Sequence, residues 1–110
     1  MEMHEEKKGD VHLLGLSGKL DATSSKAFEE RILAVIDAGE RQLVVDLSQL
    51  DYVSSAGLRV FLLAAKRLQS THGKLVLCGL QEPVREVFDI AGFLSVFSVY
   101  GSYDEVVKSL

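Results

Sequence analysis

Short apolar runs that alternate with segments of helical periodicity constrain this chain more than any other feature of its sequence. The runs are short enough to be buried strands, and the segments between them repeat apolar residues at helical spacing. This alternation predicts an α/β fold with a mostly parallel sheet and right-handed crossovers. The expected strands span residues 11–18, 42–46, 74–80 and 94–100, and the expected helices lie within residues 21–40, 55–70, 81–92 and 102–110.

The polar N-terminal segment adds a further expected strand. Met1 and Met3 alternate with charged residues, and Gly9-Asp10 resembles a turn before the apolar run that follows. We therefore expect an N-terminal antiparallel hairpin whose first strand lies at the sheet edge. The expected order is β-β-α-β-α-β-α-β-α, within one domain that covers residues 1–110.

Charge and cysteine content narrow the functional classes. Twelve basic and sixteen acidic residues give a net charge of −4, which argues against electrostatic binding to nucleic acid or to an anionic membrane. The longest apolar run, Val60 to Ala65, is far shorter than the ~20 residues that span a bilayer. The first ten residues resemble no signal peptide, and a single cysteine suits a reducing compartment. We expect a cytoplasmic protein with no membrane insertion.

The sequence gives little support for catalysis. It has no glycine-rich nucleotide motif, and the serines near Gly57 lack the preceding glycine of a nucleophile elbow. The three histidines lie far apart, and Cys78 lies in an apolar strand, so we expect no metal site, no cofactor and no catalytic residue. An enzyme or nucleotide sensor that uses the loops at the strand ends is the least favoured alternative.

The most informative segment joins an expected strand to the second expected helix. The strand is expected to end at Asp46, and a loop then leads to Ser54 and Ser55, where the helix begins. Ser54 is well placed as the N-cap, and Ser55 falls at the first helical position. Two interpretations stay open: the serines only cap the helix, or one of them is a reachable hydroxyl at a functional site.

The helix itself is apolar on nearly every side. A helix on one face of a sheet needs only one buried stripe. We therefore expect some of Leu58, Leu62 and Ala65 to be exposed beside the serines, which would favour a protein interface. Small residues such as Gly57 would let another chain approach the hydroxyl. The alternative is that a further helix covers these residues.

Three segments together resemble a known family. Gly18–Asp21 reads GKLD, Val45–Ser48 reads VDLS, and Tyr52–Leu58 reads YVSSAGL. They are similar to the signature of the bacterial anti-sigma factor antagonists, which are built on the STAS domain. The resemblance covers essentially the whole chain and implies a regulatory binding protein rather than an enzyme.

The resemblance implies a partner-switching cycle. The unphosphorylated protein binds an anti-sigma factor that is also a serine kinase, and so frees the sigma factor; phosphorylation by that kinase releases the antagonist. A metal-dependent serine phosphatase resets it. The family's phosphoacceptor maps onto Ser55, and its acidic residues map onto Asp21 and Asp46. Ser54 stands where many members have Asp, so Ser54 is a minor alternative acceptor.

We expect the partner-binding surface to surround Ser55. Asp21 has an equally good interpretation as a helix N-cap, and Asp46 as an acceptor for backbone donors in its loop. A STAS scaffold or accessory subunit of a stress-signalling or lipid transport complex, never phosphorylated, is the alternative function. The expected contact residues are Asp21, Asp46, Ser54, Ser55, Ala56, Gly57, Leu58, Arg59 and Leu62.

A phosphate on Ser55 would act on the complex more than on the fold. It adds about −1.5 to −2 charge, which a helix N-terminus favours by about 0.3–1 kcal/mol. Burying the unpaired dianion in an interface costs several kcal/mol, and a loss of ~4 kcal/mol weakens binding about a thousandfold.

Overall fold

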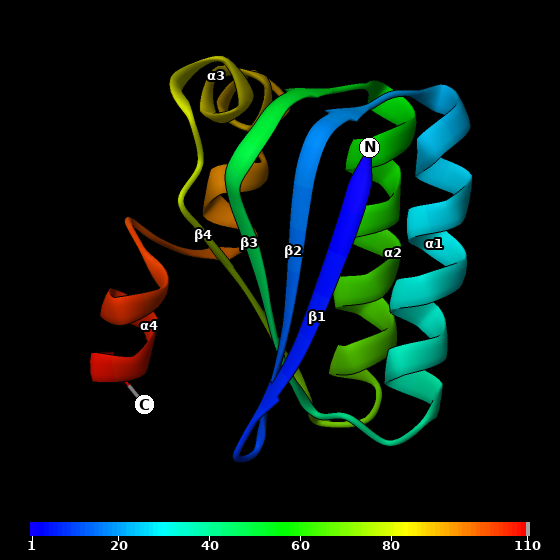
Figure 1. Ribbon diagram of the computed structural model, residues 1–110, viewed down its shortest axis with the longest axis vertical. Helices are drawn as coiled ribbons and strands as arrows, with labels where there is room; N and C mark the ends of the chain where they lie inside the picture. The colour runs from blue at the N-terminus through cyan, green and yellow to red at the C-terminus, as the bar shows by residue number, and fades with distance from the viewer. Residues whose placement is uncertain (110) are drawn as a thin grey trace.

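A five-stranded sheet with helices on both faces forms the protein. The computed structural model describes residues 1–109, and Figure 1 shows the arrangement of its elements. The strands lie in the order β1-β2-β3-β4-β5; β1 is antiparallel to β2, and the other neighbours are parallel. The elements are β1 (Glu2–Lys8), β2 (Val11–Leu20), α1 (Ala22–Asp37), β3 (Gln42–Val53), α2 (Ser55–Gln69), β4 (Lys74–Cys78), α3 (Glu82–Ile90), a 3-10 helix (Phe93–Ser95), β5 (Ser98–Tyr100) and α4 (Tyr103–Ser109).

The predicted α/β class, element order and N-terminal hairpin are confirmed. Leu110, the last residue of the final predicted helix, lies outside the described residues. The last predicted strand, residues 94–100, is wrong in its first half: residues 93–95 form a 3-10 helix, and only Ser98–Tyr100 pair with β4.

The third strand is much longer than predicted. It was expected to end at Asp46, but β3 continues to Val53 beside β2. Leu47, Leu50 and Val53 are buried at every third position rather than every second, because the β2–β3 register shifts twice in this stretch. These irregularities hide the period-two signal of a strand.

Helices cover the two faces of the sheet unequally. α1, α2 and α3 pack on one face, where the main core contains Phe28, Phe61 and Phe88 in a chain of ring contacts. α4 covers part of the other face and packs Val106 against Val44, Val76 and Cys78 there. In Figure 1, α1 and α2 lie on one side of the sheet and α4 on the other.

Ion pairs link the hairpin to α1 and to the segment that follows α1. Arg31 of α1 donates to the carboxylate of Glu5 on β1, with Nη2 at 2.7 Å from Oε1, and Lys7 pairs with Glu40. His12 Nε2 lies 2.9 Å from Glu5 Oε1. Among residues 1–109, no helix has both the length and the apolar character needed to cross a membrane.

Candidate functional site

Two adjacent serines begin α2 and differ in what their hydroxyls do. Ser54 is the N-cap: its Oγ accepts a hydrogen bond from the Gly57 N–H at 3.1 Å. Ser55 is the first helical residue and is exposed, and its hydroxyl makes no hydrogen bond within residues 1–109. The cap interpretation is therefore confirmed for Ser54. Ser55 contributes no comparable bond, so its hydroxyl is available to another molecule.

The start of α1 lies next to the start of α2. The Ser54 N–H donates to Leu20 O at 2.9 Å, and Asp21, the residue after Leu20, is the N-cap of α1. Asp21 Oδ1 accepts from the Ser24 N–H at 2.9 Å, and this bond lowers the pKa of Asp21 below its ordinary value. Two helix N-termini therefore converge beside Ser55, and both favour negative charge.

Close packing explains why glycine occupies the first turn of α2. A Cβ on Gly57 would lie 2.8 Å from Leu20 Cδ2 and 3.1 Å from Val53 Cγ2. Gly57 is buried, so the small residue serves the contact between α2 and β2 rather than the approach of another chain. Its loss of helix propensity, about 1 kcal/mol relative to Ala, is the cost of that contact.

The prediction that Leu58 lies at the contact surface is wrong, because this residue is buried. Its side chain is only 8% exposed and belongs to the main core. Leu62 and Ala65 are partly exposed, as expected. Leu58 is buried because it lies on the sheet side of α2; an all-round apolar helix does not reveal that side from its sequence.

A continuous exposed face of α2 begins at Ser55. Residues three and four apart share one face of a helix. The side chains on this face are exposed, apart from Leu62, which is partly buried. We call this face the outer stripe of α2; it consists of Ser55, Arg59, Leu62, Lys66 and Gln69. Ala56, also expected at the contact surface, lies beside it and is partly buried.

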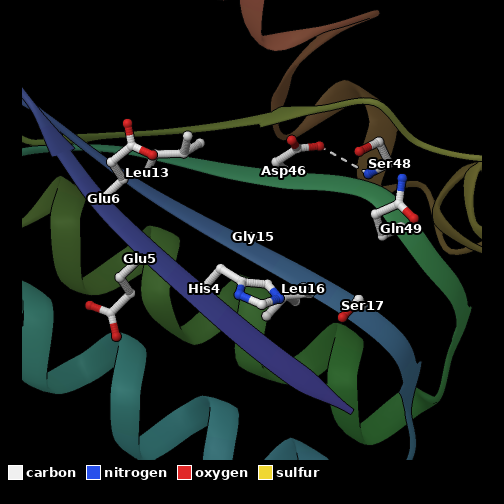
Figure 2. Close-up of a pocket in the computed structure, with 10 residues that line it drawn as sticks. All are labelled: His4, Glu5, Glu6, Leu13, Gly15, Leu16, Ser17, Asp46, Ser48 and Gln49. Carbon is white, nitrogen blue, oxygen red and sulfur yellow. Dashed lines mark hydrogen bonds between the residues drawn. The ribbon is translucent and has the colours of Figure 1, made fainter.

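Asp46 lies far from Ser55 along the chain's path. Val53, where β3 ends, lies seven residues further along the strand, about 23 Å at ~3.3 Å per residue. Its Oδ1 accepts from the Ser48 N–H at 3.0 Å, as Figure 2 shows, which is the structural role weighed for it from the sequence. The expectation that Asp46 adds negative charge around Ser55 is wrong, because β3 does not end there.

Asp46 instead lines a hollow on the other face of the sheet. This hollow measures about 370 Å³, and its walls include His4 and Glu6 of β1, Ser17 of β2, and Asp46.

Burial, with the charge of Asp46 beside it, raises the pKa of Cys78 to about 12, so this thiol is not a nucleophile at neutral pH. No three His, Cys, Asp or Glu side chains within residues 1–109 are grouped to hold a metal ion.

One supporting residue had no signal in the sequence. Gln81, just before α3, donates from Nε2 to Ser48 O and to Leu50 O, both at 3.0 Å. These bonds hold the irregular part of β3 that leads to Ser54. A glutamine before a proline-containing turn predicts no such contact, because its partners lie about thirty residues away in the chain.

Comparisons with known proteins agree with this fold. The family model of the STAS domain matches residues 3–106. BtrV of Bordetella bronchiseptica, named as a candidate anti-sigma factor antagonist, is 46% identical over 93% of this chain and 88% of its own. The anti-sigma-B factor antagonist of Staphylococcus epidermidis is 27% identical over 82% of this chain and 83% of its own.

Solved structures match the whole fold. The anti-sigma factor antagonist SpoIIAA in its unphosphorylated form superposes with a TM-score of 0.86 at 19% identity, covering 98% of this chain and 95% of its own. The phosphorylated form of SpoIIAA from Bacillus gives a TM-score of 0.78 at 18% identity, with 98% of each chain covered. The chain belongs to the STAS domain family, and its relatives there are anti-sigma factor antagonists, which are regulatory binding proteins and not enzymes.

Proposed function

We propose that this chain is an anti-sigma factor antagonist whose binding is switched off by phosphorylation of Ser55. In its unmodified form it binds an anti-sigma factor that is also a serine kinase, and so frees the sigma factor in the cytoplasm. A metal-dependent serine phosphatase restores the binding form. The names of BtrV and of the staphylococcal relative support the antagonist role, and the existence of a phosphorylated structural neighbour supports the switch.

The contrast between Ser54 and Ser55 carries the choice of acceptor. Phosphorylation of Ser54 would break the hydrogen bond that caps α2, and such a cap contributes about 1 kcal/mol to stability. Ser55 is exposed and outside that bond, so it can accept a phosphoryl group without loss of a native contact. Ser55 is therefore the favoured acceptor, with Ser54 a minor one.

The fold tolerates the added charge. The phosphate carries about −1.5 to −2 charge, and the converging N-termini of α1 and α2 favour it by about 0.3–1 kcal/mol each. Asp21 opposes it only weakly, because both charges are exposed to solvent. Because Asp46 is remote, Asp21 is the one acidic residue of the expected set that remains beside Ser55, and the net local effect is small.

The complex does not tolerate the added charge in the same way. A partner that covers Ser55 must bury the dianion or leave it unpaired, at a cost of several kcal/mol. The proposed switch therefore acts by excluding the partner from the start of α2 and leaves the fold unchanged.

Intact mass measurement after incubation with ATP and the serine kinase tests this proposal. We expect a gain of one phosphate, mapped to Ser55 by peptide analysis and abolished in Ser55→Ala. Ser54→Ala is the matched control and should still gain the phosphate. Ser55→Ala should keep its affinity for the kinase, and Ser55→Glu should lose about three orders of magnitude.

Other outcomes point to the other functions. An unmodified protein that co-purifies stably with its partner would instead support a scaffold or accessory subunit. Turnover of a small molecule would overturn the regulatory assignment.

A further inference from the structure

A groove lies beside α2, at the opposite end of the outer stripe from Ser55. Its volume is about 370 Å³, and it lies between α2 and the β4–β5 edge of the sheet. Leu62 and Ala65 form one wall, and Val96 and Phe97 form the other. Val96 is 57% exposed, so this wall of the groove presents apolar surface to solvent. We call it the α2–β5 groove; it is formed by Leu62, Ala65, Lys66, Lys74, Val96 and Phe97.

The unequal lengths of the helices leave this groove open. α2 has 15 residues, whereas α3, its neighbour on the same face, has nine and is followed by a 3-10 turn of three. β5 itself has only three residues. Within residues 1–109, α2 packs closely against α1 but makes few contacts with α3.

Basic residues border the groove, although the chain as a whole is acidic. Lys66 and Lys74 are exposed and form no ion pair within residues 1–109. Residues 52–81 contain four basic residues and no Asp or Glu. The remaining segments hold eight basic and all sixteen acidic residues, so positive charge is concentrated on α2 and β4. This surface is complementary to an acidic partner.

The outer stripe connects the groove to the proposed phosphorylation site. Arg59 lies one turn after Ser55, and the stripe then enters the groove at Leu62 and Lys66. A segment that covers Ser55 and runs along α2 therefore meets Arg59, Leu62 and Lys66 in turn. Apolar side chains would fill the groove, and carboxylates would pair with the lysines at its edge.

We infer that the α2–β5 groove is a second part of the partner interface and binds an acidic, amphipathic segment of the anti-sigma factor kinase. This inference rests on the proposed function. It also gives the switch a physical cause. A phosphate on Ser55 attracts the Arg59 guanidinium at i+4 and repels the acidic segment. Both effects weaken the same complex.

Charge reversal at the groove tests the inference. Calorimetric titration of the unphosphorylated protein with the purified kinase, without ATP, measures the affinity. We expect Lys66→Glu with Lys74→Glu to weaken binding at least about tenfold, and the difference from wild type to shrink at high salt. Arg41→Glu with Lys108→Glu is the matched control: both residues are exposed, lie outside the groove and produce the same net charge. The control should bind like wild type.

A single apolar position provides a second, independent measurement. Val96→Glu should weaken binding because it places a carboxylate where the acidic segment docks. Val107→Glu on α4, at a similarly exposed valine, should not. Unchanged thermal midpoints in all variants would show that each one folds.

The failures of the two proposals can be told apart. Normal phosphorylation of Ser55, with unchanged affinity in the Lys66/Lys74 and Val96 variants, would overturn the groove and leave the proposed function intact. Lysine-dependent binding to phosphatidylglycerol vesicles, with kinase affinity unchanged, would also overturn it. A wild-type protein that the kinase neither binds nor phosphorylates would overturn both.

Discussion

The inner side of α2 and its outer stripe belong to one helix but differ in what they contribute. The inner side buries Leu58, Phe61 and Leu68 in the main core. The outer stripe begins at the exposed Ser55 and carries Arg59 and Lys66 into solvent. A single helix therefore separates the residues that stabilise the fold from those available to a partner. A charge can be added to one side with little consequence for the other.

A charge placed on a leucine of each side of α2 should give the largest difference in stability. Leu58→Glu places a carboxylate in the core without a partner, and we expect a loss of at least about 3 kcal/mol in the free energy of unfolding. Leu62→Glu, in a partly exposed position, should cost less than about 1 kcal/mol yet weaken kinase binding. Urea unfolding and calorimetry measure the two effects. Equal destabilisation by both variants would remove the distinction between the two sides.

Adding a methyl group at Gly57, on the inner side of α2, should have the next largest effect on stability. Gly57→Ala gains helix propensity of about 1 kcal/mol, but its Cβ would lie 2.8 Å from Leu20 Cδ2. Overpacking typically costs 1–3 kcal/mol, so we expect a net loss of about 1 kcal/mol in thermal or urea unfolding. Arg59→Ala, two residues on, should be nearly neutral for stability. A stabilised Gly57→Ala protein would contradict the close contact with β2.

The smallest expected difference in stability is between variants of the two adjacent serines, because Ser54 caps α2 and Ser55 does not. Ser54→Ala removes the cap and should cost about 1 kcal/mol, whereas Ser55→Ala should stay within about 0.5 kcal/mol of wild type. Equilibrium urea unfolding of both variants measures the difference. Ser55→Ala as the more destabilising change would contradict the assignment of the cap to Ser54.

Acid should destabilise the protein through carboxylates that lie outside α2, because α2 contains no Asp or Glu. Hydrogen bonds from Ser24 lower the pKa of Asp21, and the ion pairs with Arg31 and Lys7 lower those of Glu5 and Glu40. The unfolded chain therefore binds these protons more readily, and stability falls as the pH drops below the ordinary carboxylate pKa of about 4.

Two variants should each reduce this acid sensitivity by a small amount. The first is Asp21→Asn, and the second is the double variant Glu5→Gln with Glu40→Gln. Urea unfolding between pH 7 and pH 3 measures the slope of stability against pH. The second variant removes ion pairs that link the hairpin to α1 and to the segment after α1, so its change should also diminish at high salt. Slopes identical to wild type in both variants would show that other groups govern acid unfolding.

Local chemistry explains which parts of the site could be predicted from the sequence. The start of α2 and the capping roles of Ser54 and Asp21 follow from residue types within one turn, and the structure confirms them. The strand order follows from the alternation of apolar runs and helices, because parallel neighbours need crossovers.

Long-range packing explains what could not be predicted. The extension of β3 past Asp46 depends on irregular pairing with β2, which no local period encodes. The burial of Leu58 depends on which side of a nearly all-apolar helix meets the sheet. The α2–β5 groove depends on the short α3 and on β5 lying at the sheet edge.

Burial protects the thiol of Cys78 from oxidants. Its thiol is inaccessible, and its pKa of about 12 keeps it protonated at any physiological pH. Oxidation and alkylation require the thiolate, so this side chain is protected on both counts. A cysteine introduced on the outer stripe would consequently be the one reactive thiol in the folded protein, and a fluorophore attached there would report directly on whatever covers α2.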